Sequence, residues 1–249
     1  MERSTHYSCS VSAWRPPFLA HRKVIASIGV GPHEELLAIT RPSRVAYAAR
    51  HGYDLVEETA DLAPGRPASW GKVKLVTSLL NTYQTVVWID ADAILVDHSR
   101  DIAADSPPSA KLWMVTHRYD EHAIPNMGVM VVHRSRWTTK MFDRIWNAEE
   151  FITHDWWENA ALLHMLGYNI DHTVGRVRSS VHNAHVGELP DCWNVIPQAQ
   201  QVAPAIVHFP GFPSDTRRLA LQRLARDPSA ACSLLADPHA FSKLSVSPS

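Results

Sequence analysis

The stretch Val86-Val87-Trp88-Ile89-Asp90-Ala91-Asp92-Ala93-Ile94-Leu95 decides how this chain is interpreted, because an apolar strand runs directly into two carboxylates. Strand side chains alternate between faces, so Asp90 and Asp92 point the same way if the strand continues. Two such oxygen ligands, together with phosphate oxygens, suit a hard divalent cation, Mn²⁺ or Mg²⁺. The alternative is a simple turn at the strand end, in which one Asp bonds backbone amides.

The segments before this motif alternate between strand and helix patterns. Short apolar runs predict strands at 23–29, 53–57 and 85–89. Helical spacing predicts helices at 33–39, at 42–51 with Pro42 in its first turn and Gly52 after its end, and at 69–83 with Ser69 as its cap. This alternation predicts βαβ crossovers in an α/β fold with a mainly parallel sheet, whose ligands bind at the carboxyl ends of the strands. The two aspartates lie at such an end.

The segments after the motif continue the α/β pattern. They predict strands at 112–116 and 127–132 and helices at 137–146, at 156–166 closed by Gly167, and at 214–225. The sequence contains no internal repeat and no linker long enough to divide it. We therefore expect one domain at 23–236, with a lead-in at 1–22 and a tail at 237–249.

Composition and charge exclude several classes of protein. The 249 residues are 45% hydrophobic and 20% charged, which excludes a disordered or low-complexity chain. The net charge of −1 gives no field that would recruit nucleic acid or an anionic membrane. No window approaches the ~18 apolar residues of a transmembrane helix, and no signal peptide is evident. Three widely spaced cysteines predict neither a disulfide framework nor a thiolate zinc site, so we expect a cytoplasmic protein.

A strand that ends in Asp-x-Asp has two main functional meanings. One is phosphotransfer, because the stretch resembles that of haloacid-dehalogenase-like phosphatases, in which the first Asp is the nucleophile and the second the general acid. That fold places the motif on its first strand and requires a later acidic pair. Here about 60 residues of βα pattern come first, and no such pair follows. The other meaning is a nucleotide-sugar transferase, in which the motif holds the metal that bridges the donor diphosphate.

The surrounding sequence resembles the galactosyl- and mannosyltransferases of the GMA12/MNN10 family, glycosyltransferase family 34, which have the GT-A fold. The resemblance spans 24–211, about three quarters of the chain, and its strength is the order of the motifs. The matching segments are RVAYAARHGYDLV (44–56), WGK (70–72), WIDADA (88–93), PNMGV (125–129), RSRW (134–137), ENAAL (158–162), LP (189–190) with WN (193–194), and IVHFPG (206–211).

This resemblance implies a GT-A-like, Rossmann-like enzyme. It would move a hexosyl group, galactose-like, from a nucleotide-diphosphate sugar, in particular a UDP-linked one, to a hydroxyl acceptor on a glycan or small molecule, with retention. His208 follows the β-like run 205–207, and a neutral imidazole near Asp90 and Asp92 would complete a metal set that favours Mn²⁺ over Mg²⁺. An isolated histidine after a strand is otherwise a hydrogen-bonded polar residue.

Basic residues near the motif are candidates for the donor phosphates, together with Asp90. Lys72 lies in the first turn of a predicted helix, where a cation opposes the helix dipole. The resemblance places Lys72 near the donor, although a solvated lysine is the alternative. It also implies a lysine after the His-Phe-x-Gly segment. This chain has Arg217 and Arg218 instead, of which either can substitute or lie on a solvated helix face.

Three residues are candidates for the sugar side. Glu158 either caps its own helix, as Asp155-Trp156-Trp157-Glu158 fits a capping box, or lies beside the donor sugar as the resemblance implies. Asn159 replaces the family's Gln, and Asn126 is the other candidate for the sugar contact.

The acceptor side has only a weak signal. His154, Trp156 and Trp157 would provide an acceptor platform, or else belong to the core. An inactive sugar-nucleotide-binding module is the remaining alternative to an enzyme, and front-face attack or a covalent intermediate on Glu158 are both open.

Overall fold

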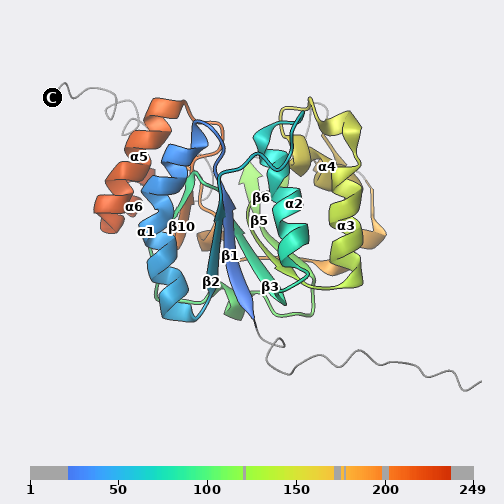
Figure 1. Ribbon diagram of the computed structural model, residues 1–249, viewed down its shortest axis with the longest axis horizontal. Coiled ribbons are helices and arrows are strands. Elements are labelled where there is room, and N and C mark those ends of the chain that lie inside the picture. The colour runs from blue at the N-terminus through green and yellow to red at the C-terminus, as the bar shows by residue number, and fades with distance from the viewer. Residues whose placement is uncertain (1–21, 120–121, 171–174, 177, 198–201, 237–249) are drawn as a thin grey trace, which may run out of the picture.

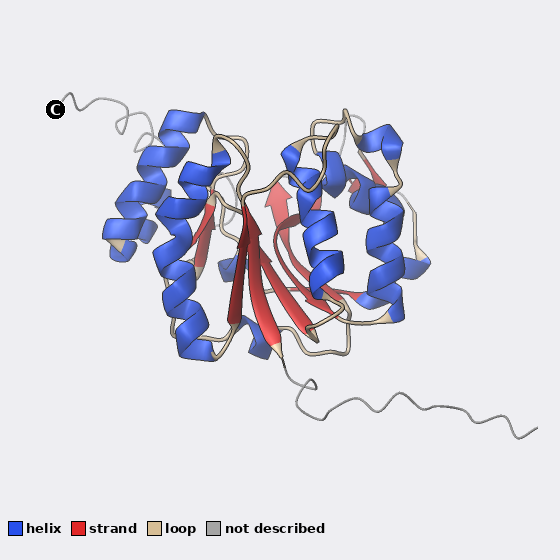
Figure 2. Ribbon diagram, viewed as in Figure 1, coloured by secondary structure: helices blue, strands red, loops and turns tan. Residues whose placement is uncertain are grey.

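The computed structural model describes residues 22–119, 122–170, 175–176, 178–197 and 202–236. The predicted tail and all but the last residue of the predicted lead-in lie outside these ranges. A six-stranded sheet in the order β2-β1-β3-β6-β5-β9 lies between two groups of helices, α1, α5 and α6 on one side and α2, α3 and α4 on the other (Figures 1 and 2).

The sheet is mainly parallel, and the α/β prediction is confirmed. Of its five neighbouring pairs, β1–β2, β1–β3 and β5–β9 are parallel, whereas β6 runs antiparallel to both β3 and β5. The strands of this sheet are β1 (Lys23–Ile28), β2 (Asp54–Glu58), β3 (Thr85–Ile89), β5 (Leu112–Tyr119), β6 (His122–His133) and β9 (Val186–Glu188). Two small sheets accompany it, formed by β4 (Ala93–Leu95) with β10 (Ile206–His208) and by β7 (Tyr168–Asn169) with β8 (Gly175–Arg176).

The helices cover both faces of the large sheet. They are α1 (His33–His51), α2 (Gly71–Leu79), α3 (Arg136–Trp146), α4 (Trp157–Met165), α5 (Ser214–Arg226) and α6 (Ala231–Ala236), of which α6 was not predicted. Among the described residues, none of these helices combines the length and the apolar character that crossing a membrane requires.

Helix α1 corrects the prediction of two separate helices around Pro42. A proline inside a helix removes one backbone hydrogen bond, but α1 runs through this position without a break. The fully buried Arg44 donates from Nη2 to the carbonyl oxygen of Leu37 at 2.7 Å, which stabilises the same part of the helix. Gly52 ends α1 as predicted, with φ of 70° and its N–H bonded to the carbonyl of Ala48.

The start of α2 also differs from the prediction. Ser69 does not cap this helix, because it lies within a short 3₁₀ turn (Ala68–Trp70) and its buried hydroxyl has no hydrogen-bond partner among the described residues. The helix begins at Gly71 instead. A Cβ at Gly71 would lie 2.8 Å from Cδ1 of Ile28, so the missing side chain lets α2 pack closely on β1.

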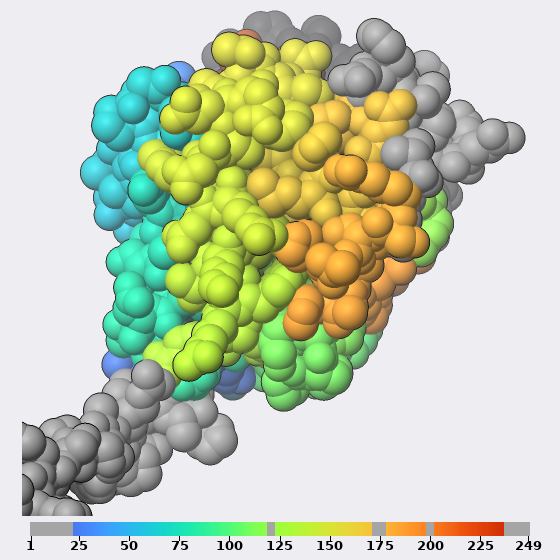
Figure 3. Space-filling view, turned by 90° about the vertical axis from the view of Figure 1, so that its right-hand side faces the viewer, coloured from blue at the N-terminus to red at the C-terminus, as the bar shows by residue number. Residues whose placement is uncertain are grey.

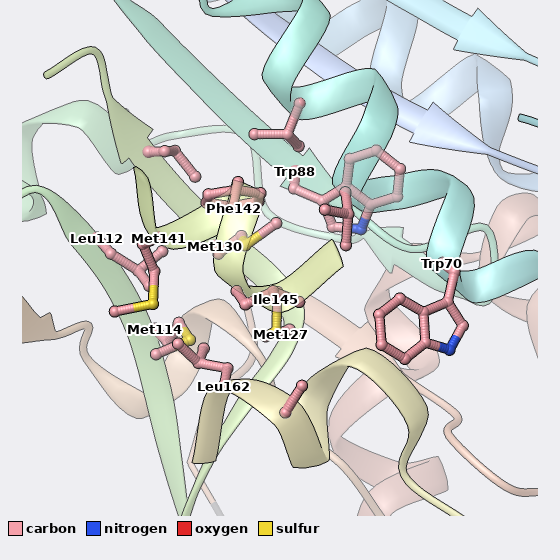
Figure 4. Close-up of a cluster of buried hydrophobic side chains, with 14 of the residues drawn as sticks. Trp70, Trp88, Leu112, Met114, Met127, Met130, Met141, Phe142, Ile145 and Leu162 are labelled. Carbon is pink, nitrogen blue, oxygen red and sulfur yellow. The ribbon is translucent and has the colours of Figure 1, made fainter. Parts of the chain in front are cut away.

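Strand β3 is buried on both faces, which fixes the position of the turn that follows it. Val86 and Trp88 pack into the cluster beneath α2, α3 and α4, where Figure 4 shows Trp88 with Trp70 and Phe142. Val87 and Ile89 pack into a second cluster on the opposite face. Because successive strand residues alternate between faces, both clusters hold the same strand.

The outer side of the first cluster is covered by the segments around α3 and α4, which dominate the face in Figure 3. The 3₁₀ segment Val181–His185 lies against α3, with the rings of Trp137 and His185 stacked at 4.8 Å. This side of the sheet is therefore closed, and the polar side chains described below lie at the end of β3 and beside the middle of β6, where the N–H of Asp90 bonds the carbonyl of Gly128.

Candidate functional site

The two aspartates lie in a tight turn between β3 and β4. The strand does not continue through them, because β3 ends at Ile89 and the N–H of Ala93 bonds the carbonyl of Asp90 at 3.0 Å. The argument from strand alternation is therefore wrong, although the turn still brings the two carboxylates together. The simple-turn alternative is also incomplete, since the carboxylates bond side chains: Asp90 Oδ1 accepts from Trp88 Nε1 at 2.6 Å.

His208 reaches the aspartates through the pairing of β10 with β4, in which it lies opposite Ala93. Its Nε2 is 3.3 Å from Asp92 Oδ1 and 3.8 Å from Asp90 Oδ2. One ligand atom from each of the three residues lies within 4.8 Å of the others. The structure thus brings together the three residues that the sequence analysis grouped as metal ligands.

The imidazole of His208 is held in a closely packed position. It is 2% exposed, and a Cβ on Gly128 of β6 would lie 2.1 Å from its Cε1 atom. On the other side, Nδ1 is 2.9 Å from Oδ1 of Asn194. Only a glycine at position 128 leaves room for the ring.

Lys72 lies at the centre of the charged groups. Its Nζ is 3.0 Å from Asp90 Oδ1, 3.0 Å from Glu158 Oε1 and 3.3 Å from the carbonyl oxygen of Met127. Burial alone would lower the pKa of Lys72, but Asp90 and Glu158 outweigh it and raise that pKa above its ordinary value. The ammonium group therefore stays charged and links two carboxylates, while its direct contact with a donor remains a prediction.

Glu158 lies in the first turn of α4 but does not cap this helix. The capping-box interpretation is wrong, because the N-cap residue is Trp156, whose side chain makes no capping hydrogen bond, and Glu158 Oε1 pairs with Lys72 instead. Glu158 is 3% exposed, and its Oε1 pairs with Lys72. Its Oε2 is buried without a hydrogen-bond partner among the described residues. A buried carboxylate oxygen without a partner is costly and is consistent with a role at the site.

Of the two candidate arginines in α5, Arg217 lies at the site. Its Nη1 is 2.9 Å from Asp92 Oδ2, and its buried Nε has no partner among the described residues. Arg218 instead lies 3.5 Å from Asp215 and 4.0 Å from Glu35. Burial raises the pKa of Asp92, but His208 and Arg217 outweigh it and hold that pKa well below its usual range.

The two asparagines predicted on the sugar side lie beside the metal-ligand candidates. Asn159 Oδ1 accepts from the N–H of Met127 at 3.0 Å. Asn126 Oδ1 accepts from the N–H of Gly128 at 2.8 Å and from Asn194 Nδ2 at 2.9 Å. Both side chains therefore bond to the backbone of β6, and their contact with a sugar remains a prediction.

The predicted platform residues differ in exposure. His154 Nδ1 accepts from the N–H of Trp156, and Trp156 packs against the first core cluster. Trp157 has 42% of its surface exposed and a φ of 47°, which is the left-handed region that a tryptophan rarely adopts.

Sequence reasoning did not assign functions to Asn194 and His117. Asn194 was noted as part of a motif, and it is fully buried between β6 and His208. His117 Nε2 lies 2.7 Å from the backbone carbonyl of Asn194, to which it donates. Nothing in the sequence near His117 signals this contact, because the two residues are 77 positions apart.

The burial of His117 leads to an expected pH dependence. Burial lowers the pKa of His117 to about 4, below the ordinary histidine value, so the unfolded chain binds a proton that the folded protein excludes. Stability is fully present above about pH 6.5 and falls as the pH approaches 4, with a loss of about 2 kcal/mol from this residue at pH 5. In His117→Gln, which can still donate to Asn194, we expect this part of the loss to disappear. Urea unfolding of both proteins at pH 7 and pH 5 measures it, and an equal loss in both would contradict the assignment.

Known proteins that resemble this chain were compared in sequence and in structure. A sequence model of the galactosyl transferase GMA12/MNN10 family matches residues 25–106, the stretch from β1 past the two aspartates. This confirms the resemblance over that stretch. No curated protein matches the sequence.

Several solved structures share the fold. A glycosyltransferase involved in the glycosylation of the major capsid of PBCV-1 is 15% identical, with 80% of this chain and 99% of that chain covered and a TM-score of 0.60. The apo-form glycosyltransferase GlyE of Streptococcus pneumoniae TIGR4 is 13% identical, covers 92% of this chain and 65% of that chain, and has a TM-score of 0.56. An active site mutant of LgtC is 12% identical, with coverage of 90% and 97% and a TM-score of 0.52. The fold is the GT-A glycosyltransferase fold, and the family match over residues 25–106 supports a glycosyltransferase.

Proposed function

We propose that this chain, which has the GT-A fold, is a metal-dependent glycosyltransferase. It moves a hexosyl group, galactose-like, from a UDP-linked sugar to a hydroxyl acceptor with retention. The observation that carries this proposal is the convergence of Asp90, Asp92 and His208 at the end of β3. These residues lie beyond the carboxyl end of β3, and in open α/β folds ligands bind beyond the carboxyl ends of the parallel strands.

The residues present fit a divalent cation. Two carboxylates and one imidazole provide oxygen and nitrogen ligands, a set that suits Mn²⁺ better than Mg²⁺. Together with Glu158, Lys72 and Arg217, they leave the site with one net negative charge when His208 is neutral. A divalent cation held by these residues would reverse this sign and would supply positive charge to a leaving diphosphate.

The chain's own charged groups then have separate roles. Arg217 Nε, which has no partner in the described part of the chain, is available to a phosphate oxygen while Nη1 holds Asp92. Lys72 pairs with both Asp90 and Glu158, which fixes the position of the Glu158 carboxylate on the side proposed for the sugar. The unpartnered Oε2 of Glu158 is available either to stabilise positive charge at the anomeric carbon during front-face attack or to act as a nucleophile.

Product formation tests this proposal against the two alternatives. Purified protein with Mn²⁺ and a panel of nucleotide sugars is expected to hydrolyse one donor slowly without acceptor. An inactive binding module would be stabilised by the donor in a thermal shift assay but release no sugar. A phosphohydrolase would instead release phosphate from an aryl phosphate, which we do not expect because the fold is that of glycosyltransferases.

Trp157 is the proposed contact with the acceptor, because an exposed ring presents an apolar face to a sugar. Its positive φ costs stability, and strained residues of this kind gather at functional sites. We expect Trp157→Gly to raise the melting temperature, since glycine adopts this φ freely. The same change should raise KM for the acceptor by about 3- to 10-fold and leave slow donor hydrolysis unchanged. An unchanged acceptor KM would contradict this placement.

A further inference from the structure

Two side-chain amides and one imidazole form a continuous hydrogen-bonded path behind the candidate metal ligands, and two of the three groups, Asn194 and His208, are buried. The path runs from the N–H of Gly128 to Asn126, from Asn126 to Asn194 and from Asn194 to His208, with distances of 2.8, 2.9 and 2.9 Å. Asn194 is the middle member and is fully buried. None of the roles assigned above accounts for its side chain.

The orientation of each amide in this path is fixed by the backbone at its start. The N–H of Gly128 is a donor that cannot reverse, so the Asn126 atom it contacts is the oxygen. That oxygen also faces Asn194, which therefore presents its NH₂ group to Asn126. The remaining atom of the Asn194 amide, its Oδ1, is then the one that faces His208 Nδ1. An oxygen in this position requires the proton of the imidazole to be on Nδ1.

The backbone of Asn194 is held as well. His117, 2% exposed, donates to its carbonyl oxygen at 2.7 Å. The side-chain amide therefore cannot turn away from His208 without breaking its hydrogen bonds to Asn126 and to His208. This distinguishes Asn194 from a polar residue that fills space.

The aspartates on the other side of the ring favour the opposite arrangement. His208 Nε2 lies 3.3 Å from Asp92 Oδ1, so a proton on Nε2 would form a charge-assisted hydrogen bond there. Such a proton would occupy the lone pair that a metal ion needs. The site therefore needs a group that holds the proton at Nδ1.

We propose that Asn194 is a positioning residue that selects the Nδ1-protonated form of His208 and so presents the Nε2 lone pair to the cation. This inference rests on the proposed metal site. The ligand concerned is the divalent cation. Asn126 and the N–H of Gly128 orient the amide of Asn194 for this role. Groups behind a metal-bound histidine commonly fix its ring and its tautomer in this manner, and their loss costs about 10- to 100-fold in metal affinity.

Two substitutions of Asn194 separate positioning from a purely structural role. Leucine has a similar size but accepts no hydrogen bond, whereas aspartate accepts one from Nδ1 but introduces a buried charge beside the oxygen of Asn126. If Asn194 only maintains the packing, Asn194→Asp is the more damaging change. If it selects the tautomer, Asn194→Leu loses about 10- to 100-fold in affinity for Mn²⁺ alone, and Asn194→Asp stays within a few-fold of the wild type.

The tautomer itself is read from the imidazole ¹⁵N chemical shifts of metal-free protein, at a pH where His208 is neutral. We expect a proton on Nδ1 in the wild type and in Asn194→Asp, and on Nε2 in Asn194→Leu. A proton on Nε2 in the wild type, or equal loss of Mn²⁺ affinity in both variants, would overturn the proposal. If Asn194→Leu does not fold, Asn126→Ala frees the Asn194 amide to turn and should give a mixture of tautomers. A single Nδ1-protonated form in that variant would also count against the proposal.

The two readouts separate this inference from the proposed function. Wild-type protein that carries the proton on Nδ1 but binds no Mn²⁺ would refute the metal site and leave the hydrogen-bonded path intact. If the wild type and all the variants bind Mn²⁺ with the same affinity, the proposed function is retained and the role of Asn194 is refuted.

Discussion

Replacing Asp92 by asparagine is expected to abolish sugar transfer and to remove the thermal stabilisation that we expect Mn²⁺ and UDP together to give the wild-type protein. Asp92 lies in the turn after β3, within reach of both His208 Nε2 and Arg217 Nη1. Asparagine fills the same space but removes the negative charge that a cation requires. Turnover should fall by at least about 100-fold, because charge stabilisation at the leaving group is lost.

Asp97→Asn is the matched control for this experiment. Asp97 is an exposed aspartate five residues further along, and its carboxylate bonds only Ser99 among the described residues. Its amide variant should transfer sugar at the wild-type rate and keep the shift with Mn²⁺ and UDP. Wild-type turnover by Asp92→Asn itself would rule out the metal assignment.

Replacing Glu158 by glutamine is expected to reduce kcat by about 100-fold or more with little change in melting temperature. The glutamine oxygen can still accept a hydrogen bond from Lys72, which keeps its second carboxylate partner, Asp90. The change therefore preserves the packing of α4 but removes the charge that we propose to lie beside the sugar. Steady-state kinetics and thermal unfolding of the same samples measure the two effects.

Asp101→Asn provides a comparison with a second lysine–carboxylate pair. Asp101 lies 2.7 Å from Lys23, which begins β1 and so lies at the opposite end of the parallel strands from the site. Its amide variant should lower the melting temperature without changing kcat. If Glu158→Gln shows this same pattern, its carboxylate is structural and the catalytic role is wrong.

The parts of the molecule that could be predicted from the sequence are those set by local pattern. Strand β3 has the predicted bounds, because Thr85 is followed by four consecutive apolar residues that end at a carboxylate. The end of α1 was also predictable, since Gly52 adopts a conformation that glycine favours. The approach of His208 to the aspartates followed from the order of the motifs rather than from its own neighbours.

The rest depends on contacts between residues distant in the chain. Strand β6 runs antiparallel to both β3 and β5. This direction depends on strand pairing, which the local sequence pattern does not predict. Glu158 fitted a capping box by spacing, but the buried ammonium of Lys72 binds it instead. The role of Asn194 was not predictable for the same reason, because its amide is fixed by Asn126, 68 positions away.

The pairing of β10 with β4 has a consequence for how the site is made during synthesis. Arg217 lies 125 positions after Asp92, and the imidazole ligand is also encoded far downstream of the two acidic ones. Contacts of such high sequence separation form slowly, since closing a long loop costs entropy before the contact repays it. The nascent chain therefore carries its acidic turn with Lys72 but without His208 and Arg217 until β10 and α5 dock. If the proposed metal site is correct, a refolding experiment should regain Mn²⁺ affinity no earlier than the β4–β10 pair forms.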